Sequence, residues 1–317
     1  MRVVVVGGGM AGLTAARLID TGGHRVTVLD KGRRPGGRMA TKQLGSGAAA
    51  DHGAQFFTVR SEAFAAVVHA WVADGTVHEW CRGFSSEDGH PRYAVANGMA
   101  QLAAHMSSGL DVRSSMHVDT VRSTGGRWSV TWPATERGPA GTLEADVVVL
   151  TAPAPQSAAL VSGEVTIPDL DFEPALSLLV ALREPPAIPA PGGVQPDDDP
   201  TWSWIGDNVA KGASAVPAVT LHTHAGVASS RWGEPDETLV LDLVRAAQPW
   251  IGGAEIIDAR VHRWRYATPI TPYPDPCLVE AEGGLVFAGD AFGGPRVEGA
   301  FLSGRAAADA VLHGRTW

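Results

Sequence analysis

Three glycines near the start of the chain have the type and spacing that bind a dinucleotide: Gly7, Gly9 and Gly12. The first permits a tight turn, the second lets the backbone approach a pyrophosphate, and the third allows a helix to lie close to a strand. Asp30 follows 18 residues after Gly12, where it can accept hydrogen bonds from both hydroxyls of a ribose. The pattern predicts an adenine dinucleotide at the positive end of a helix, the alternative being a Gly-rich turn without a ligand.

Two further segments decide between NAD and FAD, which share this glycine pattern. Arg38 follows Pro35-Gly36-Gly37, where an arginine can reach the far side of a dinucleotide phosphate, although it could also be a surface arginine. Asp290 follows Phe287-Ala-Gly and can bind a ribityl hydroxyl or simply cap a helix. A second helix opening near Val297 can stabilise negative charge on a reduced flavin. A nicotinamide enzyme has no use for this second site, so the sequence predicts FAD.

The motifs, taken together, resemble the FAD-dependent amine-oxidase superfamily and, within it, the renalase family, particularly the bacterial members. The matching stretches include GGRMAT at residues 36–41, DHGAQFFT at 51–58, TAP at 151–153, LHT at 221–223, WR at 264–265, and GD at 289–290 with GPRVEGAFLSG at 294–304. They span nearly the whole chain, and the combination is specific, whereas the first glycine motif alone indicates only the superfamily.

This resemblance implies an oxidase of the 2- or 6-dihydro isomers of NAD(P)H that returns NAD(P)⁺ and passes electrons from FAD to O2, giving H2O2. It also implies that Ala11, Arg38, Gln55 and Phe56 contact FAD. The C-terminal motif follows the bacterial rather than the animal pattern, which leaves the preferred isomer open. The residues that we assign to the cofactor are Gly7, Gly9, Met10, Ala11, Gly12, Asp30, Lys31, Gly37, Arg38, Met39, Ala54, Gln55, Phe56, Val118, Thr151, Gly289, Asp290, Val297 and Ala300.

For the substrate, the sequence offers candidate residues and no recognisable motif. Hydride transfer to a flavin depends on alignment of the substrate more than on a general acid or base. His222 and His224 alternate on one predicted strand, so both point to the same face, which is either the substrate face or solvent. Arg296 could neutralise a substrate phosphate or form a structural salt bridge. The remaining candidates could line the pocket, flank the flavin in an amine oxidase, or belong to the core: Trp202, Trp204, His262, Trp264 and Tyr266.

The elements that must position these residues are predicted from apolar spacing and turn residues. The chain opens with a strand–helix–strand unit, followed by an irregular Gly-rich loop over 31–55. Further elements are helices over 61–72, 97–105, 236–250 and 298–312, and strands over 111–121, 128–132, 144–151 and 284–288. The predicted fold class is α/β: a Rossmann-type, amine-oxidase-like FAD-binding domain and a mixed-sheet α+β substrate domain. The FAD-binding domain comprises 1–60, 95–160 and 261–317, and the substrate domain comprises 61–94 and 161–260.

The amino-acid composition limits the classes of molecule that the protein is expected to bind. The 317 residues carry a net charge of −9 with no basic cluster, which argues against nucleic acid. Two distant cysteines indicate a reducing, cytoplasmic setting without a metal site, and no apolar run is long enough for a membrane helix. The expected partners are a small dinucleotide substrate and O2. A flavin amine oxidase acting on a small amine and a flavin-binding module without turnover stay open as alternatives.

Overall fold

The computed structural model describes residues 1–84, 89–136, 138–165, 167–280 and 283–314; the other positions, which fall within the predicted domains, lie outside the described residues. The chain forms two compact units. Unit 1 comprises Met1–Gly37, Ala103–Asp171 and Pro269–Trp317, and unit 2 comprises Arg38–Leu102 and Phe172–Thr268. The units differ from the predicted domains most at residues 38–60, which group with unit 2 because the N–H of Asp51 bonds the side chain of Asn208. The functional division into domains stays a prediction.

Unit 1 contains a six-stranded sheet, largely parallel, whose central strands are short apolar runs, rich in Val and Leu and buried on both faces. Its order is β17 (Leu278–Val279), β18 (Leu285–Phe287), β11 (Val147–Leu150), β1 (Arg2–Val6), β2 (Arg25–Asp30) and β7 (Asp111–Ser114). Val4 of the central strand pairs with Val148 and Thr27 in parallel register, and only β17 runs antiparallel. The Rossmann-type prediction is confirmed.

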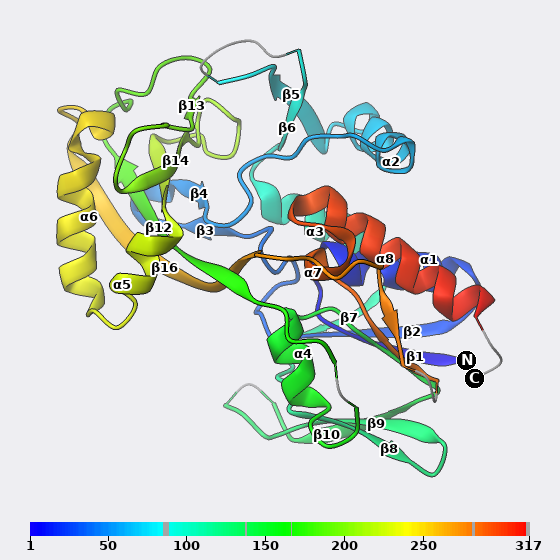
Figure 1. The fold of residues 1–317 in the computed structure, drawn as a ribbon. Helices are drawn as coiled ribbons and strands as arrows, with labels where there is room; N and C mark the ends of the chain where they lie inside the picture. Colours follow the sequence, from blue (N-terminus) through cyan, green and yellow to red (C-terminus); the bar gives the residue numbers. More distant parts are fainter. Residues whose placement is uncertain (85–88, 137, 166, 281–282, 315–317) are drawn as a thin grey trace. The chain divides into compact units, whose positions relative to one another are not determined.

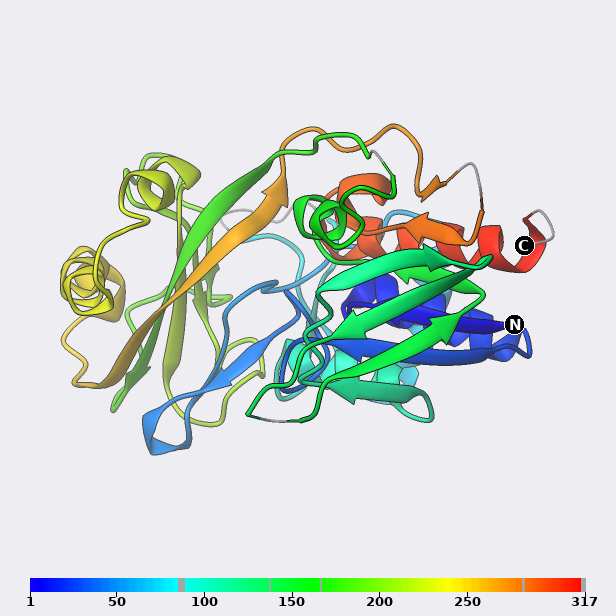
Figure 2. The same cartoon turned by 90° about the horizontal axis from the view of Figure 1, so that it is seen from below.

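Two layers cover this sheet (Figure 1). On one face, α1 (Met10–Thr21) lies beside α8 (Arg296–His313), and a Cβ at Gly304 of α8 would overlap the backbone of Ala11. The other face is covered by an antiparallel sheet in the order β10 (Gly141–Ala145), β9 (Arg127–Trp132) and β8 (Thr120–Thr124) (Figure 2). The remaining helices of unit 1 are α4 (Ala154–Leu160) and α7 (Asp290–Gly293), and α3 (Met99–Ser107) spans the boundary of the two units.

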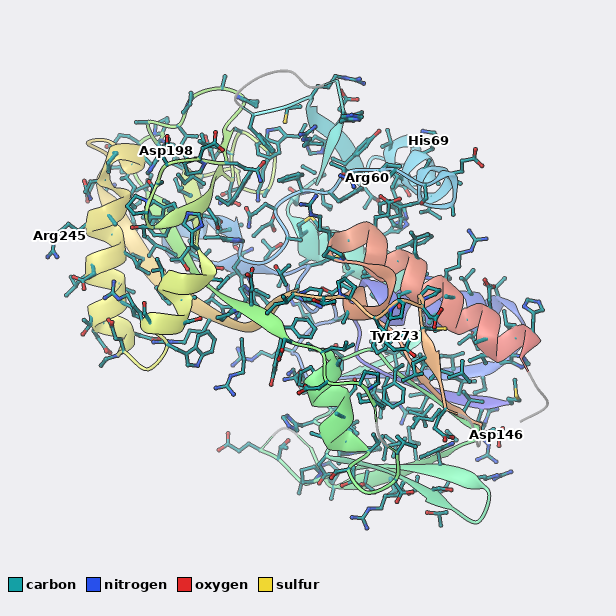
Figure 3. The ribbon with its side chains drawn as sticks, in the orientation of Figure 1. Arg60, His69, Asp146, Asp198, Arg245 and Tyr273 are labelled. Carbon is teal, nitrogen blue, oxygen red and sulfur yellow. The ribbon has the colours of Figure 1, made fainter. Side chains whose placement is uncertain are left out.

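Unit 2 is built on a five-stranded antiparallel sheet in the order β13 (Gly193–Val194), β14 (Trp202–Asp207), β15 (Ala218–Thr223), β12 (Phe172–Leu182) and β16 (Ile256–Pro269). One face packs on α5 (Ala225–Ser230) and α6 (Asp236–Ile251), whose Leu239, Leu243 and Ala247 repeat every four residues (Figure 2). Arg245 extends from the opposite side of α6 (Figure 3).

The other face of this sheet packs on the hairpin β3 (Thr41–Gln43) and β4 (Ala49–Asp51), joined by the short 3-10 turn η1 (Gly45–Gly47). The last elements are α2 (Glu62–Ala73) and the hairpin of β5 (Val77–Cys81) and β6 (Arg92–Val95). Together the two units confirm the predicted mixed α/β class. None of the helices in the described ranges is long and apolar enough to cross a membrane.

Two predicted strands are wrong in their extent. The run predicted over 144–151 divides at Asp146 (Figure 3), whose carboxylate accepts the N–H of Arg2 at 2.7 Å, so that β10 and β11 belong to different sheets. The run over 111–121 also divides, because Ser115, directly after β7, has a φ of +61° that interrupts the extended chain. Val118, expected on a strand, lies in the connection between β7 and β8.

Candidate functional site

The glycine loop between β1 and α1 leaves a space that a side chain would fill. Gly7 has a φ of +110°, and a Cβ at Gly12 would overlap the Gly7 carbonyl, so both glycines are required by the loop itself. A Cβ at Gly9 would meet nothing nearer than the Gly36 oxygen at 4.0 Å, and α1 has no side-chain cap at its N-terminus. An uncapped helix end beneath an open backbone is suited to a pyrophosphate.

Neighbouring segments of unit 1 hold this loop in place. Thr151, at the end of β11, donates its hydroxyl to the carbonyls of Val6 and Gly7 at 3.1 and 3.0 Å. From the other side, Gly36 donates its N–H to Gly8 at 2.7 Å, and Gly37 has a φ of +54°. Met10 and Ala11 are buried in the first turn of α1. Part of the predicted set therefore comes together around one loop: Gly7, Gly9, Met10, Ala11, Gly12, Gly37 and Thr151.

Asp30 is fixed by backbone groups at the end of β2. Its two carboxylate oxygens accept the N–H of Gly8 at 2.6 Å and that of Gly32 at 2.7 Å, and the side chain is only 7% exposed. Each oxygen keeps a second lone pair for a ribose hydroxyl. Lys31 turns away and donates to Gln156 at 3.2 Å. The segment ending at Val118 is tied to this place by the hydrogen bond from Met116 to Asp30.

The second predicted cofactor segment lies where α7 meets α8. Gly289 has a φ of +140° and donates its N–H to Ser303 at 2.8 Å, which places Asp290 as the buried first residue of α7. Val297 and Ala300 lie in the first two turns of α8. Arg296 opens the helix with a φ of +79° and makes no ion pair to any residue that the structure describes. The alternative of a structural salt bridge is therefore not observed there.

Unit 2 contains a buried ionic network that the sequence does not reveal. The Lys211 ammonium, fully buried, lies 3.1 Å from an Asp51 carboxylate oxygen and donates to the Gln55 side-chain oxygen at 2.7 Å. The other Asp51 oxygen accepts from Thr41 at 2.5 Å and from the N–H of Met99 at 2.8 Å. Burial lowers the pKa of Lys211, and the Asp51 carboxylate opposes this.

His222 is the outermost member of this network. Its Nε2 lies 3.3 Å from the Gln55 side-chain nitrogen, and the imidazole is half-buried. Burial and the Lys211 ammonium lower the pKa of His222 to about 3, so that the ring is neutral at physiological pH. His224 does not share its position: β15 ends at Thr223, and the His224 ring bonds the Asp199 carbonyl at 3.0 Å. The prediction that both histidines lie on one strand is wrong, because His224 is the residue that precedes α5.

An aromatic cluster adjoins this network through the strand register. Trp204 of β14 pairs with His222 of β15, and its ring lies 5.2 Å from Phe56 and 4.9 Å from Phe84. Trp80 completes the cluster at 5.4 Å from Phe84. We call Phe56, Trp80, Phe84 and Trp204 the aromatic wall.

Trp202 does not belong to the wall. A bulge between Trp202 and Trp204 turns the two indoles to opposite faces of the sheet, and Trp202 donates instead to Ala246 within the α6 core. The indole nitrogen of Trp204 is buried and bonds none of the described residues.

A second aromatic group lies on β16. His262 and Trp264 share one face of the strand, with ring centroids 4.3 Å apart, and both contact His52. Burial, followed by His262, lowers the pKa of His52 to about 3, and burial lowers that of His262 to about 4. Trp264 donates to the His52 carbonyl at 2.5 Å. Tyr266, two residues further along, contacts Phe172 instead.

Arg38, predicted to reach a phosphate, is oriented by the end of β16. Its guanidinium donates to the carbonyls of Tyr266 and Ala267 at 3.2 and 3.0 Å and lies over the Phe172 ring. Met39 is buried, and Ala54 donates its N–H to the Arg38 carbonyl at 2.9 Å. Contact of Arg38, Gln55 and Phe56 with the cofactor stays a prediction.

The fold and the loop define a dinucleotide-binding protein with a Rossmann-type nucleotide domain. Comparison with family models is consistent with this: a model of NAD(P)-binding Rossmann-like domains matches residues 5–71, and one of flavin containing amine oxidoreductases matches residues 60–312. The chain belongs to the flavin containing amine oxidoreductase family. FAD is its cofactor, and the open space above Gly9 fits the pyrophosphate of that group.

Individual relatives match only a short part of the chain. The Arabidopsis thaliana protein FLOWERING LOCUS D is 48% identical over 59 residues, which is 18% of this chain and 8% of the relative. Hydroxyneurosporene desaturase of Rubrivivax gelatinosus is 49% identical over 59 residues, which is 19% of this chain and 11% of the relative. An L-amino-acid oxidase of Siganus canaliculatus is 56% identical over 39 residues, 12% and 7% of the two chains.

Solved structures resemble the whole chain in fold. A protein designated a protoporphyrinogen oxidase from Exiguobacterium sp. 255-15 superposes with a TM-score of 0.73 at 14% identity, covering 98% of both chains. A putrescine oxidase bound to putrescine superposes with a TM-score of 0.70 at 15% identity, covering 98% of this chain and 99% of the other. At this level of identity the similarity extends to the fold alone.

Sequence reasoning missed Lys211, Asp51 and Asn208. Lys211 is an isolated lysine in a turn, a place where lysine is ordinarily exposed, and its burial follows from pairing with a residue 160 positions earlier. Asp51 lies inside the DHGAQFFT stretch, which was the available signal. A carboxylate within a predicted cofactor-binding motif indicates that a cationic side chain pairs with it, but no sequence pattern identifies that side chain as Lys211.

Proposed function

We propose that the protein is a renalase-like oxidase of isomeric dihydronicotinamide dinucleotides, the 2- or 6-dihydro forms of NAD(P). The observation that carries this proposal is the charge and shape of the groups around His222: the Lys211 ammonium lies behind Gln55 and lowers the pKa of His222, and Trp204 of the aromatic wall pairs with His222 in the strand register. Bound FAD would supply a two-electron acceptor: the substrate would lose a hydride to become NAD(P)⁺, and the two electrons, the proton of that hydride and one proton from solvent would reach O2 as H2O2.

The charge distribution favours a neutral reacting group. An ammonium substrate requires a carboxylate or an open aromatic face free of competing cations. The Asp51 carboxylate is already bonded by Lys211, Thr41 and the N–H of Met99. A dihydropyridine ring is flat and uncharged, and it can lie against the aromatic wall without facing a like charge.

The candidate residues take the following roles in this proposal. The aromatic wall, or Trp264 with Tyr266 on β16, receives the ring, and His222 faces it as a neutral imidazole. Arg296, exposed at the start of α8, neutralises a substrate phosphate. No residue is assigned as a general base, because hydride transfer depends on alignment. His224 is left out because its ring bonds Asp199. A cytoplasmic location and O2 as the acceptor are part of the proposal.

The test is anaerobic mixing of the holoenzyme with a partially isomerised NADH preparation, followed by admission of air. We expect the minor isomers to bleach the flavin band rapidly, and we expect the band to recover in air with formation of peroxide. The control is purified NADH, the ordinary 4-dihydro isomer of NAD. Bleaching by the control at the same rate, or no bleaching by any isomer, would contradict the proposal.

A second candidate function is oxidation of a small amine, which family membership and the fold shared with putrescine oxidase favour. Putrescine and aromatic amines therefore belong in the same anaerobic assay. Bleaching by an amine but by none of the dihydronicotinamides would select this candidate. Bleaching by neither class would favour a binding module without turnover.

A further inference from the structure

We propose that His222 presents its Nδ1–H as a hydrogen-bond donor to a carbonyl oxygen on the substrate ring, and that Gln55 and Lys211 are positioning residues that fix this donor. The inference rests on the proposed function and specifies what the site recognises: a planar ring that carries a neutral carbonyl substituent.

The orientation of the Gln55 amide follows from its partners. Lys211 can only donate when charged, so the Gln55 atom 2.7 Å from its ammonium is the oxygen. The amide nitrogen then faces the carbonyls of Asp51 at 2.7 Å and Gly53 at 3.1 Å, which only accept. The contacts with Lys211, Asp51 and Gly53 all require the same orientation, so they assign the oxygen and the nitrogen of the Gln55 amide.

This orientation determines the tautomer of His222. The Gln55 nitrogen has two N–H groups and no acceptor site, and it lies 3.3 Å from the Nε2 of His222, so one N–H is shared between a backbone carbonyl and Nε2. Nε2 must therefore accept, which requires that it carry no proton, and in a neutral imidazole the proton is then on Nδ1. Protonating both nitrogens would direct an N–H of His222 at the Gln55 amide N–H groups, with the Lys211 ammonium behind them.

The Nδ1 atom of His222 is available to a ligand. It bonds none of the described residues, and it is not among the buried side-chain atoms that lack a partner, so it lies at the exposed edge of the half-buried ring. Gln55 and Lys211, by contrast, are 6% and 0% exposed. The network therefore presents a single donor at its outer end.

The aromatic residue beside His222 determines which ligand groups can reach its Nδ1–H. Trp204 lies opposite His222 in the strand register and belongs to the aromatic wall. A flat ring stacked on the wall would place a substituent beside Nδ1–H, and that substituent must accept a hydrogen bond. The carboxamide of a nicotinamide has such an oxygen, whereas a primary ammonium group has donors only.

Hydrogen bonds to Asp51 keep the network, and with it the His222 donor, in one arrangement. The backbone N–H of Asp51 donates to the side-chain oxygen of Asn208 at 3.1 Å, and its backbone carbonyl accepts from the Thr220 hydroxyl at 2.8 Å. The carboxylate and the carbonyl of one residue thus fix Lys211 and Gln55 together. Such a fully bonded buried network specifies one arrangement of its donors and acceptors.

The test uses the oxidised product as a probe, so that binding is measured apart from turnover. NAD⁺ and its analogue with hydrogen in place of the carboxamide are titrated into the holoenzyme by calorimetry. We expect the wild type to bind NAD⁺ about tenfold or more tightly than the analogue, because loss of the acceptor leaves the donor unpaired. His222→Phe should bind both probes alike, and His222→Asn, which retains a donor near the Nδ1 position, should restore part of the difference.

A second measurement reads the tautomer directly. Nitrogen-15 NMR of the holoenzyme should show His222 protonated on Nδ1 in the wild type. Gln55→Glu should move a proton to Nε2, because a carboxylate oxygen there accepts instead of donating. Matched circular dichroism spectra establish that this variant is folded; if it is not, the wild-type spectrum alone still decides the tautomer.

The outcomes separate the two proposals. An Nε2–H tautomer in the wild type, or equal binding of both probes, overturns the role of His222. Discrimination between the probes that persists in His222→Phe also overturns it. If discrimination is present and depends on His222 but no dihydro isomer bleaches the flavin, the proposed function fails and the recognition of the carbonyl stands.

Discussion

Gly9→Ala should separate cofactor binding from folding. The backbone at Gly9 has φ −82° and ψ −172°, which alanine adopts readily, and the added Cβ would come no closer than 4.0 Å to any described atom beyond the neighbouring residues. Folding should be unaffected or favoured by about 0.4–1 kcal/mol, since alanine restricts the unfolded chain. The same methyl group occupies the space that we assign to the pyrophosphate. Loss of two backbone hydrogen bonds to a charged group, about 1.5 kcal/mol each, would weaken FAD binding about 100-fold.

Gly12→Ala is the matched control, because it adds the same methyl group in the same loop. Its Cβ would overlap the Gly7 carbonyl and lie 2.7 Å from the Thr151 hydroxyl, so the loop must shift. A cost of about 1–3 kcal/mol corresponds to a thermal midpoint lower by about 2–12 °C. The assays are FAD titration of the apoprotein by flavin fluorescence and thermal melts followed by circular dichroism. A Gly9→Ala protein that binds FAD as the wild type does would refute the assignment of the space to the cofactor.

Three further predictions concern charge. Asp30→Ala should reduce FAD affinity by about 1–3 kcal/mol in the same titration, because a ribose would lose a charged acceptor; unchanged affinity would contradict the ribose assignment. Lys211→Met should lower stability by about 3–5 kcal/mol, since it leaves the Asp51 charge buried and unpaired, whereas adding Asp51→Asn should recover more than half of the loss in denaturation curves; additive losses would contradict the pairing. The free energy of unfolding should fall as the pH drops below 6.5, because histidines of the unfolded chain take up protons there while the pKa values of His52 and His262 in the folded protein are about 3 and 4. Each such group contributes up to about 1.4 kcal/mol per pH unit, and His52→Phe should reduce the slope of thermal midpoint against pH between 6.5 and 4; an unchanged slope would exclude His52 as its source.

The nucleotide-binding part of the fold was predictable because its signals are local. The Val run of β1, the glycines and the acid at the end of β2 lie within 30 residues, and each has one strong physical interpretation. The division at Asp146 was not predictable, because it depends on a hydrogen bond to the distant N–H of Arg2. The end of β7 was not predictable either, because Ser115 takes a φ of +61° that its residue type does not indicate.

The substrate side was less predictable for a related reason. His262 and Trp264 share one face of β16, as two-residue spacing on a regular strand requires, but the bulge after Trp202 separates it from Trp204, and β15 ends before His224. A one-residue irregularity reverses every inference drawn from alternation. The partner of Asp51 could not be identified from the sequence at all, since the ionic pair joins segments with no shared pattern.

The apolar core of unit 1 brings together Val3, Val28, Val149, Val286 and Val311, so it needs side chains from both ends of the chain. A ribosome that adds about 5–20 residues per second requires about 15–60 s between the synthesis of the first and the last of these positions. During that interval the opening strand lacks its layer of α8, while the segments that form unit 2 have already emerged. We therefore expect unit 2 to fold first, and nascent chains to depend on chaperones that shield β1 until α8 has been synthesised.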